Sequence, residues 1–328
     1  MARRAVVIGG SLGGLFTAAF LQQLGWQVDI YERVADDLAT RGAGLGTHDA
    51  LLDALAALGV GRDEHLGILV SERICLDTAG QVVARRTLPQ VMSHWARIYG
   101  ALRPLLLPQA QPRYAGYVGW RGTVTDIDLP HEYYFVLPRG EMMLTYPVPT
   151  GEWNYVWYRP TTERELAKLC TDSTGHCHGT AIAPPLIREE FVATLKRDAR
   201  SLLAPQLVPI VERSRPFFQA IFDLESPRIV QGRAVLLGDA AFVARPHVGM
   251  GVTKGSLDAR CLARSIELAG DDLDAALERY DRLRCEFGRW CVNRSRSIGA
   301  YIEQRALADP ARVLSEVGAV RADVPITY

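Results

Sequence analysis

The segment 6–15, VVIGGSLGGL, constrains the fold of this chain more than any other feature. A short apolar run ends in glycines, and apolar residues then recur at helical spacing between residues 12 and 24. An alternating run, WQVDIYER, follows at residues 26–33. This order predicts a buried strand, a helix and a second strand, with the helix N-terminus placed directly at the glycine-rich turn.

The turn matches the dinucleotide-binding pattern Gly-x-Gly-x-x-Gly at Gly9 and Gly14, but Ser11 occupies the second glycine position. The three positions allow a tight turn, a close approach to pyrophosphate and close helix–strand packing. Serine is small enough to keep the approach and adds a hydroxyl. Glu32 lies 23 positions after Gly9, where an acid that binds ribose hydroxyls is expected. We therefore predict a nucleotide site; the alternative is a turn that only packs.

A second glycine motif, GDAAFVARPHVGMG, covers residues 238–251. A buried strand is predicted at 234–237, and a loop through Pro246 leads to Gly249, Gly251 and a long helix. A strand end again delivers a helix N-terminus, an arrangement that binds anionic groups. Asp239, beside a glycine at the strand end, either binds ligand hydroxyls or caps a helix.

The middle of the chain, residues 114–160, is rich in Tyr, Trp and Val and predicts a mixed sheet. Such a sheet suits a flat apolar ligand, although aromatic side chains also simply fill cores. Tyr117, Trp120 and Arg121 share one strand and are candidates for lining a pocket, with simple core packing as the alternative. Other patterns predict a loop and then a helix within 40–59, a hairpin at 67–87 and helices at 94–108, 186–204, 207–222 and from 273 onward.

Composition limits the classes of partner. Lys plus Arg and Asp plus Glu are both 37, so no basic excess indicates nucleic acid, and no apolar run is long enough to span a membrane. Six cysteines without a Cys-x-x-Cys pair are typical of reduced thiols in the cytoplasm. No metal site is expected at 170–179, because His176, Cys177 and His178 are consecutive and do not readily converge on one ion.

The two glycine motifs, together with VDIYER, RGAGLG, PRYAGYVGWRG, WNYVWYRP and RPFFQAIFD, resemble the single-component FAD-dependent aromatic hydroxylases. The likeness is greatest to the 2,6-dihydroxypyridine 3-hydroxylase-like branch and covers nearly the whole chain. It implies an α/β fold: an abbreviated GR2-type Rossmann-like FAD-binding domain, a mixed β-sheet substrate domain and C-terminal helices. The implied boundaries are 1–112 and 229–328 for the two parts of the FAD domain, and 113–228 for the substrate domain.

The resemblance also implies roles for individual residues. His247, in the loop beside the flavin, is the candidate catalytic residue, although a backbone-bonded histidine is an equal alternative. Tyr117, Trp120 and Arg121 are the candidate substrate residues. The implied FAD site consists of Gly9, Ser11 and Gly14 at the pyrophosphate, Glu32 and Arg33 near the adenosine ribose, Arg41, Gly238 and Asp239 at the ribityl chain, and Pro246, Gly249, Met250 and Gly251 against the isoalloxazine.

The implied activity is FAD-dependent monooxygenation. NADH or NADPH reduces the flavin, O2 forms a flavin hydroperoxide, and an electron-rich aromatic or polyketide-like small molecule is hydroxylated. The expected partners are that substrate and O2, with no nucleic acid and no membrane, and a homodimer is an open alternative.

One departure from the family pattern follows Arg103. There the family has extra strands of the FAD domain and an Asp-Gly motif, whereas this chain runs directly into PRYAGYVGWRG and contains no Asp-Gly pair. An internal deletion in the FAD domain is therefore expected. It leaves a second reading open, a flavin-scaffold or cofactor-free relative that cyclises, rearranges or only binds a small aromatic compound. The intact motifs at both ends of the chain favour the hydroxylase.

Overall fold

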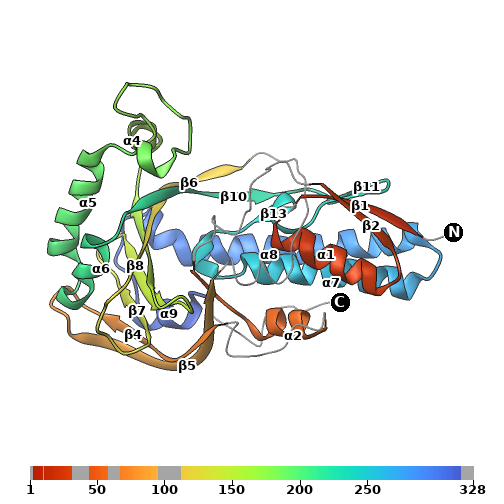
Figure 1. The fold of residues 1–328 in the computed structure, drawn as a ribbon, viewed down its shortest axis with the longest axis horizontal. Coiled ribbons are helices and arrows are strands. Elements are labelled where there is room, and N and C mark those ends of the chain that lie inside the picture. Colours follow the sequence, from red (N-terminus) through yellow and green to blue (C-terminus); the bar gives the residue numbers. More distant parts are fainter. Residues whose placement is uncertain (1–2, 10, 32–43, 58–66, 95–111, 319–328) are drawn as a thin grey trace.

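The computed structural model describes residues 3–9, 11–31, 44–57, 67–94 and 112–318. These residues form a small parallel sheet with long helices and a large mixed sheet (Figure 1). Helix α8 (Leu273–Glu303) joins the two parts, since its first half packs near the small sheet and its second half on the large one. The predicted α/β class with a mixed sheet and C-terminal helices is confirmed.

The first thirty residues form the predicted strand–helix–strand unit. Strand β1 (Arg4–Ile8) pairs in parallel with β2 (Gln27–Tyr31), and α1 (Leu12–Gln23) connects them. Helix α1 packs along α7 (Gly251–Ala269) from the opposite end of the sequence, with Phe16 among the fully buried contacts. Both ends of the chain therefore build one unit, which brings the two glycine motifs into the same region.

The prediction of a fully buried N-terminal strand is wrong for one of its faces. Val6, Ile8 and Tyr31 are 59%, 43% and 62% exposed, whereas Ala5 and Val28 pack inward. Strands of parallel sheets are normally covered on both faces. Here the described parallel sheet has two strands, and the predicted strand at 234–237 contributes only β12 (Ala234–Val235), which pairs with β11 (Val230–Gln231).

The large sheet has nine strands among the described residues. All neighbouring pairs are antiparallel except β4 with β7, which is parallel. The strands, in sheet order, are β13 (Phe242–Val243), β10 (Phe217–Glu225), β6 (Arg113–Val124), β9 (Trp153–Pro160), β8 (Met142–Pro147), β7 (Tyr133–Val136), β4 (Ile68–Leu76), β5 (Val82–His94) and β3 (Gly44–Gly46).

This sheet separates two hydrophobic cores, because successive side chains of a strand point to opposite faces. On β6, Tyr117 belongs to the core beneath α8 and α9 (Pro310–Glu316), and Trp120 belongs to the core on the other face. Helices α4 (Glu163–Leu169), α5 (Glu189–Leu202) and α6 (Val208–Glu212) contribute to that second core, and Figure 1 shows them together at one end of the molecule.

The predicted helix at 207–222 is largely wrong. Only α6 is helical, and the chain then forms β10, which pairs with β6 at Phe217↔Arg121 and Phe218↔Trp120. The apolar run FFQAIF is ambiguous in isolation, because short apolar segments fit either period. Pairing with β6 decides the outcome, which is a tertiary effect.

The remaining predictions fare differently. The hairpin at 67–87 is confirmed by β4 and β5, and the helix within 40–59 by α2 (Asp49–Ala57). The predicted helix at 94–108 lies outside the described residues except for His94, which ends β5. None of the described helices has the length and apolar character needed to cross a membrane. Short 3-10 helices are η2 (Pro184–Leu186), η3 (Pro205–Leu207), η4 (Gly238–Ala240) and η5 (Pro246–Val248).

Replacement of Gly288 tests how closely α8 packs on β13. A Cβ at Gly288 would overlap the ring of the buried Phe242, so Gly288→Ala must displace that ring. We expect a net loss of about 1–3 kcal/mol in the free energy of unfolding, measured by urea denaturation, despite the higher helix propensity of alanine. Glu286→Ala, at an exposed position of the same helix, is the control. Equal stability of both variants would contradict this packing.

Candidate active site

The two glycine motifs meet at a contact of three glycine backbones. A Cβ at Gly13 would lie 3.6 Å from the Cα of Gly238 and 3.8 Å from that of Gly255. A Cβ at Gly255 would lie 3.3 Å from the Cα of Gly13. The N-terminal part of α1 therefore approaches α7 and η4 closely: a Cβ at Gly255 would be tight against Gly13, whereas the distances from a Cβ at Gly13 to Gly238 and Gly255 are those of ordinary contacts.

The turn before α1 has the geometry of an anion site. Gly9 is buried with φ +126°, a conformation that favours glycine, and its N–H donates to the carbonyl of Tyr31 at 2.8 Å. Ser11 is the exposed N-cap, and its hydroxyl makes no capping hydrogen bond. The first N–H groups of a helix lack partners within the helix and carry its positive dipole end. Gly14 lies in this first turn.

The second motif places a carboxylate and another helix N-terminus beside the first. Asp239 in η4 is exposed, and no described residue donates a hydrogen bond to its carboxylate. The surrounding protein partly desolvates this carboxyl and raises its pKa, an effect that Lys254 opposes. Gly249 adopts φ +70°, and Gly251 begins α7 with open space around its Cα. Pro246 is exposed, whereas Met250 is buried in the core beneath α8.

His247 lies buried at the junction of η5, α8 and the large sheet. One ring nitrogen, Nε2, is 2.8 Å from the hydroxyl of Tyr117, and Nδ1 has no hydrogen-bond partner among the described residues. Burial, together with the charge of Arg245, lowers the pKa of His247 to about 3. The imidazole is therefore neutral at physiological pH. Burial also raises the pKa of Tyr117, so its phenol stays protonated.

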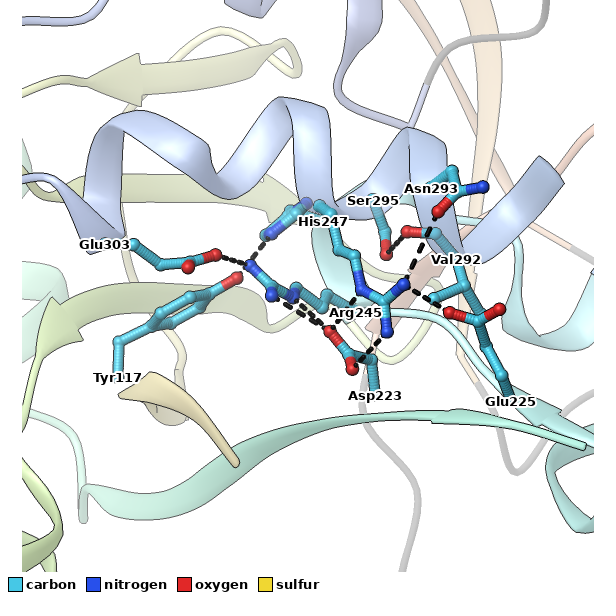
Figure 2. A network of polar contacts seen from close by, with 10 residues as sticks. Tyr117, Asp223, Glu225, Arg245, His247, Val292, Asn293, Ser295 and Glu303 are labelled. Atoms are coloured by element: carbon cyan, nitrogen blue, oxygen red, sulfur yellow. Dashed lines mark hydrogen bonds and ion pairs between the residues drawn. The ribbon is translucent and has the colours of Figure 1, made fainter. Parts of the chain in front are cut away.

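Arg245 organises the surroundings of this pair, as Figure 2 shows. Its guanidinium donates from Nε and Nη2 to Oδ2 of the buried Asp223, at 3.0 and 2.9 Å, and also pairs with Glu303. It lies over the ring of Tyr117 at 5.6 Å. A Cβ at Gly299 of α8 would come within 2.7 Å of the Tyr117 hydroxyl, so this glycine leaves the room that the cluster needs.

Buried aromatic side chains extend from His247 along the same face of the sheet, within the core beneath α8. Tyr158 packs edge-on against both Tyr117 and His247, at centroid distances of 6.1 and 5.4 Å. Arg121 is buried on this face and lowers the pKa of Tyr158, which burial raises to about 12 overall. Tyr133 packs against neighbouring strands of the same core. This buried cluster combines flat aromatic rings with the guanidinium of Arg121 and the hydroxyl groups of the tyrosines.

The three predicted substrate residues do not share one surface. Tyr117 and Arg121 lie on the aromatic face, but Trp120 points to the opposite face and packs against Phe218. There it lines a separate hollow of about 240 Å³ with Arg159 and Phe191. Side chains alternate between the two faces along a strand, and this rule alone is enough to separate Trp120 from its two neighbours.

The structure brings together most of the predicted cofactor residues. Gly9, Ser11 and Gly14 lie at the start of α1, which meets Gly238 of η4 beside Asp239. Gly249 and Gly251 lie at the start of α7, whose Gly255 also contacts Gly13. Glu32, Arg33 and Arg41 lie outside the described residues, so their predicted roles stay predictions. Within the described ranges, no group of three His, Cys, Asp or Glu side chains is placed to hold a metal ion.

Several residues of the region escaped sequence reasoning. Gly13 and Gly255 carry the backbone contact, and GSLGG offers two adjacent glycines without showing which one packs. The C-terminal segment was also missed: Gly318 donates its N–H to the carbonyl of His247 at 2.9 Å. The fully buried Arg73 binds the carbonyls of Leu314, Val317 and Gly318. No short motif signals such long-range contacts.

The arrangement fits FAD. Two helix N-termini and a glycine turn with positive φ suit a pyrophosphate, which needs N–H donors and a bare backbone. Asp239 offers polyol hydroxyls an acceptor that no described residue occupies. The Pro246–Val248 turn contains His247, which contacts the aromatic side chains of the sheet. This region suits a planar ring system. In this arrangement the ring end of FAD would lie at the Pro246–Val248 turn and would face the substrate side.

Comparisons with known proteins define the class. Residues 114–223 match a family model described as FAD binding domain-like. Over 98% of its length the chain is 25% identical to 2,6-dihydroxypyridine 3-monooxygenase of Paenarthrobacter nicotinovorans, of which the match covers 97%. The chain is thus similar over nearly its whole length to a monooxygenase of the branch that the motifs predicted. This alignment spans 396 positions, more than the 328 residues of this chain. It therefore confirms that this chain lacks internal residues that the relative has.

Solved structures agree in fold. The structure of 2,6-dihydroxypyridine-3-hydroxylase from Arthrobacter nicotinovorans superposes with a TM-score of 0.88 at 23% identity, covering 100% of both chains. Klebsiella pneumoniae HpxO in complex with FAD and uric acid gives a TM-score of 0.75 at 20% identity, covering 95% of this chain and 90% of that one. At these identities the superpositions show the fold alone. The full-length sequence similarity to a monooxygenase is what favours the hydroxylase reading over the cofactor-free alternative.

The buried neutral state of His247 predicts acid sensitivity. Between its ordinary pKa of 6.5 and its folded value of about 3, the unfolded chain binds a proton that the folded protein does not. Stability is therefore lost as pH falls through this window, by up to about 1.4 kcal/mol per pH unit. His247→Gln should flatten the fall between pH 6.5 and 4.5, measured by urea denaturation. His176→Gln, at an exposed histidine, should leave it unchanged; parallel curves for all three proteins would refute the neutral state.

Proposed function

We propose that this protein is an FAD-dependent monooxygenase that hydroxylates an electron-rich aromatic small molecule. One atom of O2 enters the ring as a hydroxyl group and the other leaves as water, and NADH or NADPH supplies the two electrons. The observation that carries the proposal is the contact of Gly13 with Gly238 and Gly255, which joins the two glycine motifs, and the second of these motifs also carries His247 with its bond to Tyr117. The full-length similarity to FAD-dependent monooxygenases supports it.

The residues around the glycine contact would hold FAD. The N–H groups at the start of α1 and the Ser11 hydroxyl face the pyrophosphate, and Asp239 accepts from the ribityl hydroxyls. The Pro246–Gly251 segment supports the ring system. When bound, FAD supplies the redox chemistry: uptake of a hydride from the nicotinamide and activation of O2. The protein supplies binding, orientation and exclusion of water.

Tyr117 and His247 are suited to hydrogen-bond a ring hydroxyl group of the substrate. An aromatic ring is more reactive towards an electrophilic oxygen when its hydroxyl is deprotonated. The neutral imidazole of His247, bonded through Nε2 to the Tyr117 hydroxyl, retains Nδ1 for one further hydrogen bond. Arg245 holds both residues through its buried pair with Asp223. We assign His247, which stays neutral, as the residue that hydrogen-bonds the ring hydroxyl through Nδ1, and Tyr117 as its hydrogen-bond partner, with Arg121 and Tyr158 on the substrate side.

We also infer a cytoplasmic protein whose partners are its substrate and O2. Five of the six cysteines are buried free thiols, which supports a reducing environment. The outward face of β1 and β2 exposes Val6, Ile8 and Tyr31 beside the Arg4–Asp29 ion pair, a mixed surface on which a homodimer could form. We keep the boundaries 1–112, 113–228 and 229–328 as a proposal, supported by the packing of α1 on α7.

Cofactor binding provides the first test. The purified protein should bind FAD with quenching of flavin fluorescence, and bound FAD should be released on denaturation. With FAD bound, phenols and hydroxypyridines should stimulate NADH or NADPH oxidation, with a hydroxylated product seen by mass spectrometry. Failure to bind added FAD would refute the proposal. Oxidation that yields only hydrogen peroxide with every ring tested would refute the hydroxylation.

Tyr117→Phe tests the assignment of the hydrogen-bonding pair. Loss of the hydroxyl removes the hydrogen bond to His247, so kcat for hydroxylation should fall by about 10-fold to 100-fold. FAD affinity should be retained, because Tyr117 lies away from the glycine turns. Tyr155→Phe is a matched control: its hydroxyl is also buried and contacts Ser214, but on the opposite face of the sheet. Equal rates for both variants would contradict the assignment.

A further inference from the structure

Three charged side chains are buried beneath Gly238, where α7, α8 and η4 meet. Lys254, Asp258 and Arg284 have side chains no more than 4% exposed. Lys254 and Asp258 are one turn apart on α7, and Arg284 comes from α8. Sequence reasoning had assigned no role to any of them. Burial of three charges is costly, and well-packed apolar residues of similar size are often more stabilising. Their presence therefore requires an explanation other than stability.

The contacts of this cluster converge on the backbone of a single residue. The N–H of Gly238 donates to Oδ2 of Asp258 at 2.9 Å, and the carbonyl of Gly238 accepts from Nζ of Lys254 at 2.5 Å. Lys254 and Asp258 are themselves 3.4 Å apart. Both polar groups of the Gly238 peptide backbone are thus held by buried charges. Gly238 has φ +59° and directly precedes Asp239, so its conformation sets the direction of that carboxylate.

Arg284 fixes the carboxylate that holds the turn. Its Nε donates to Oδ1 of Asp258 at 2.7 Å, and its guanidinium lies over the ring of Phe287 at 4.1 Å. Asp258 is therefore bonded through both oxygens and cannot rotate away from Gly238. These buried charges lower the pKa of the Asp258 carboxyl despite its desolvation, so it stays ionised.

The charges of the cluster also affect the pKa of the Asp239 carboxyl group. Two cations surround one buried carboxylate, which leaves an excess positive charge beneath the turn. Desolvation raises the pKa of Asp239; the charge of Lys254 opposes that shift, and the charge of Asp258 adds to it. An ionised carboxylate is the stronger acceptor for hydroxyl groups. The cluster therefore acts on both the direction and the ionisation of the same side chain.

We propose that Lys254, Asp258 and Arg284 form a positioning unit that holds Gly238 and aims the Asp239 carboxylate at the polyol chain of the flavin cofactor. The inference rests on the proposed function, since it assumes that FAD occupies the glycine turns. It assigns to these three residues a part in cofactor affinity, acting through Asp239, although none of them touches the cofactor.

A double-mutant cycle in FAD affinity tests this unit. Lys254→Met removes the bond to the Gly238 carbonyl and should weaken FAD binding by about 10-fold to 100-fold in a fluorescence titration of the apoprotein. In the Asp239→Asn background the same change should weaken binding by less than about threefold, because the carboxylate through which Lys254 acts is already absent. Lys168→Met, at an exposed lysine of α4, is the control and should leave affinity unchanged.

Each outcome of the cycle has a meaning. An equal loss of affinity in both backgrounds, or no loss in either, would overturn the positioning unit while leaving the proposed function intact. Absence of FAD binding to the unmodified protein would overturn the proposed function itself. Thermal unfolding of each variant checks that it is folded. If Lys254→Met does not fold, the cycle is run with Lys254→Gln, which keeps a donor without the charge, and the same non-additivity is required.

Discussion

The close approach of three glycine backbones is the constraint on which the rest of the site depends. Gly13, Gly238 and Gly255 come from the two ends of the chain, and their contact sets the distance between α1, α7 and η4. The start of α1 therefore lies beside η4, which carries Asp239, and the Leu237 side chain also packs against Gly13. The proposed cofactor residues depend on that spacing. The buried side chains of Asp258 and Lys254 hold the Gly238 backbone in its place.

The large sheet contributes the second half of the site by having two different faces. Side chains that alternate along β6 enter separate cores, so a single strand supplies Tyr117 to the reaction side and packs Trp120 against Phe218 on the other. Helix α8 covers the reaction side and also reaches the small sheet. One helix thereby relates the position of the cofactor turns to that of the aromatic surface, and Gly299 of that helix leaves space for His247.

The sequence predicted those parts of the fold that local patterns encode. The strand–helix–strand unit, the hairpin of β4 and β5 and the aromatic strands follow from periodicity and turn residues, and the motifs located the cofactor turns. Strand β10 was missed because FFQAIF becomes a strand only by pairing with β6. Arg284 pairs with Asp258 in the buried cluster at Lys254, and Arg73 bonds the C-terminal segment at Gly318. These contacts join residues far apart in sequence, and no local pattern encodes them.

The outward apolar face of β1 and β2 shows how a cofactor unit can be shortened. The alignment with a longer relative indicates lost residues, and the described parallel sheet has two strands with Val6, Ile8 and Tyr31 open to solvent. Even so, α1 packs along α7 on its inner side, and Gly13 of α1 lies against Gly238 and Gly255. In the described residues, the position of the glycine-rich end of α1 is therefore set by a helix from the other end of the chain, and the two strands beside it leave their outer face uncovered.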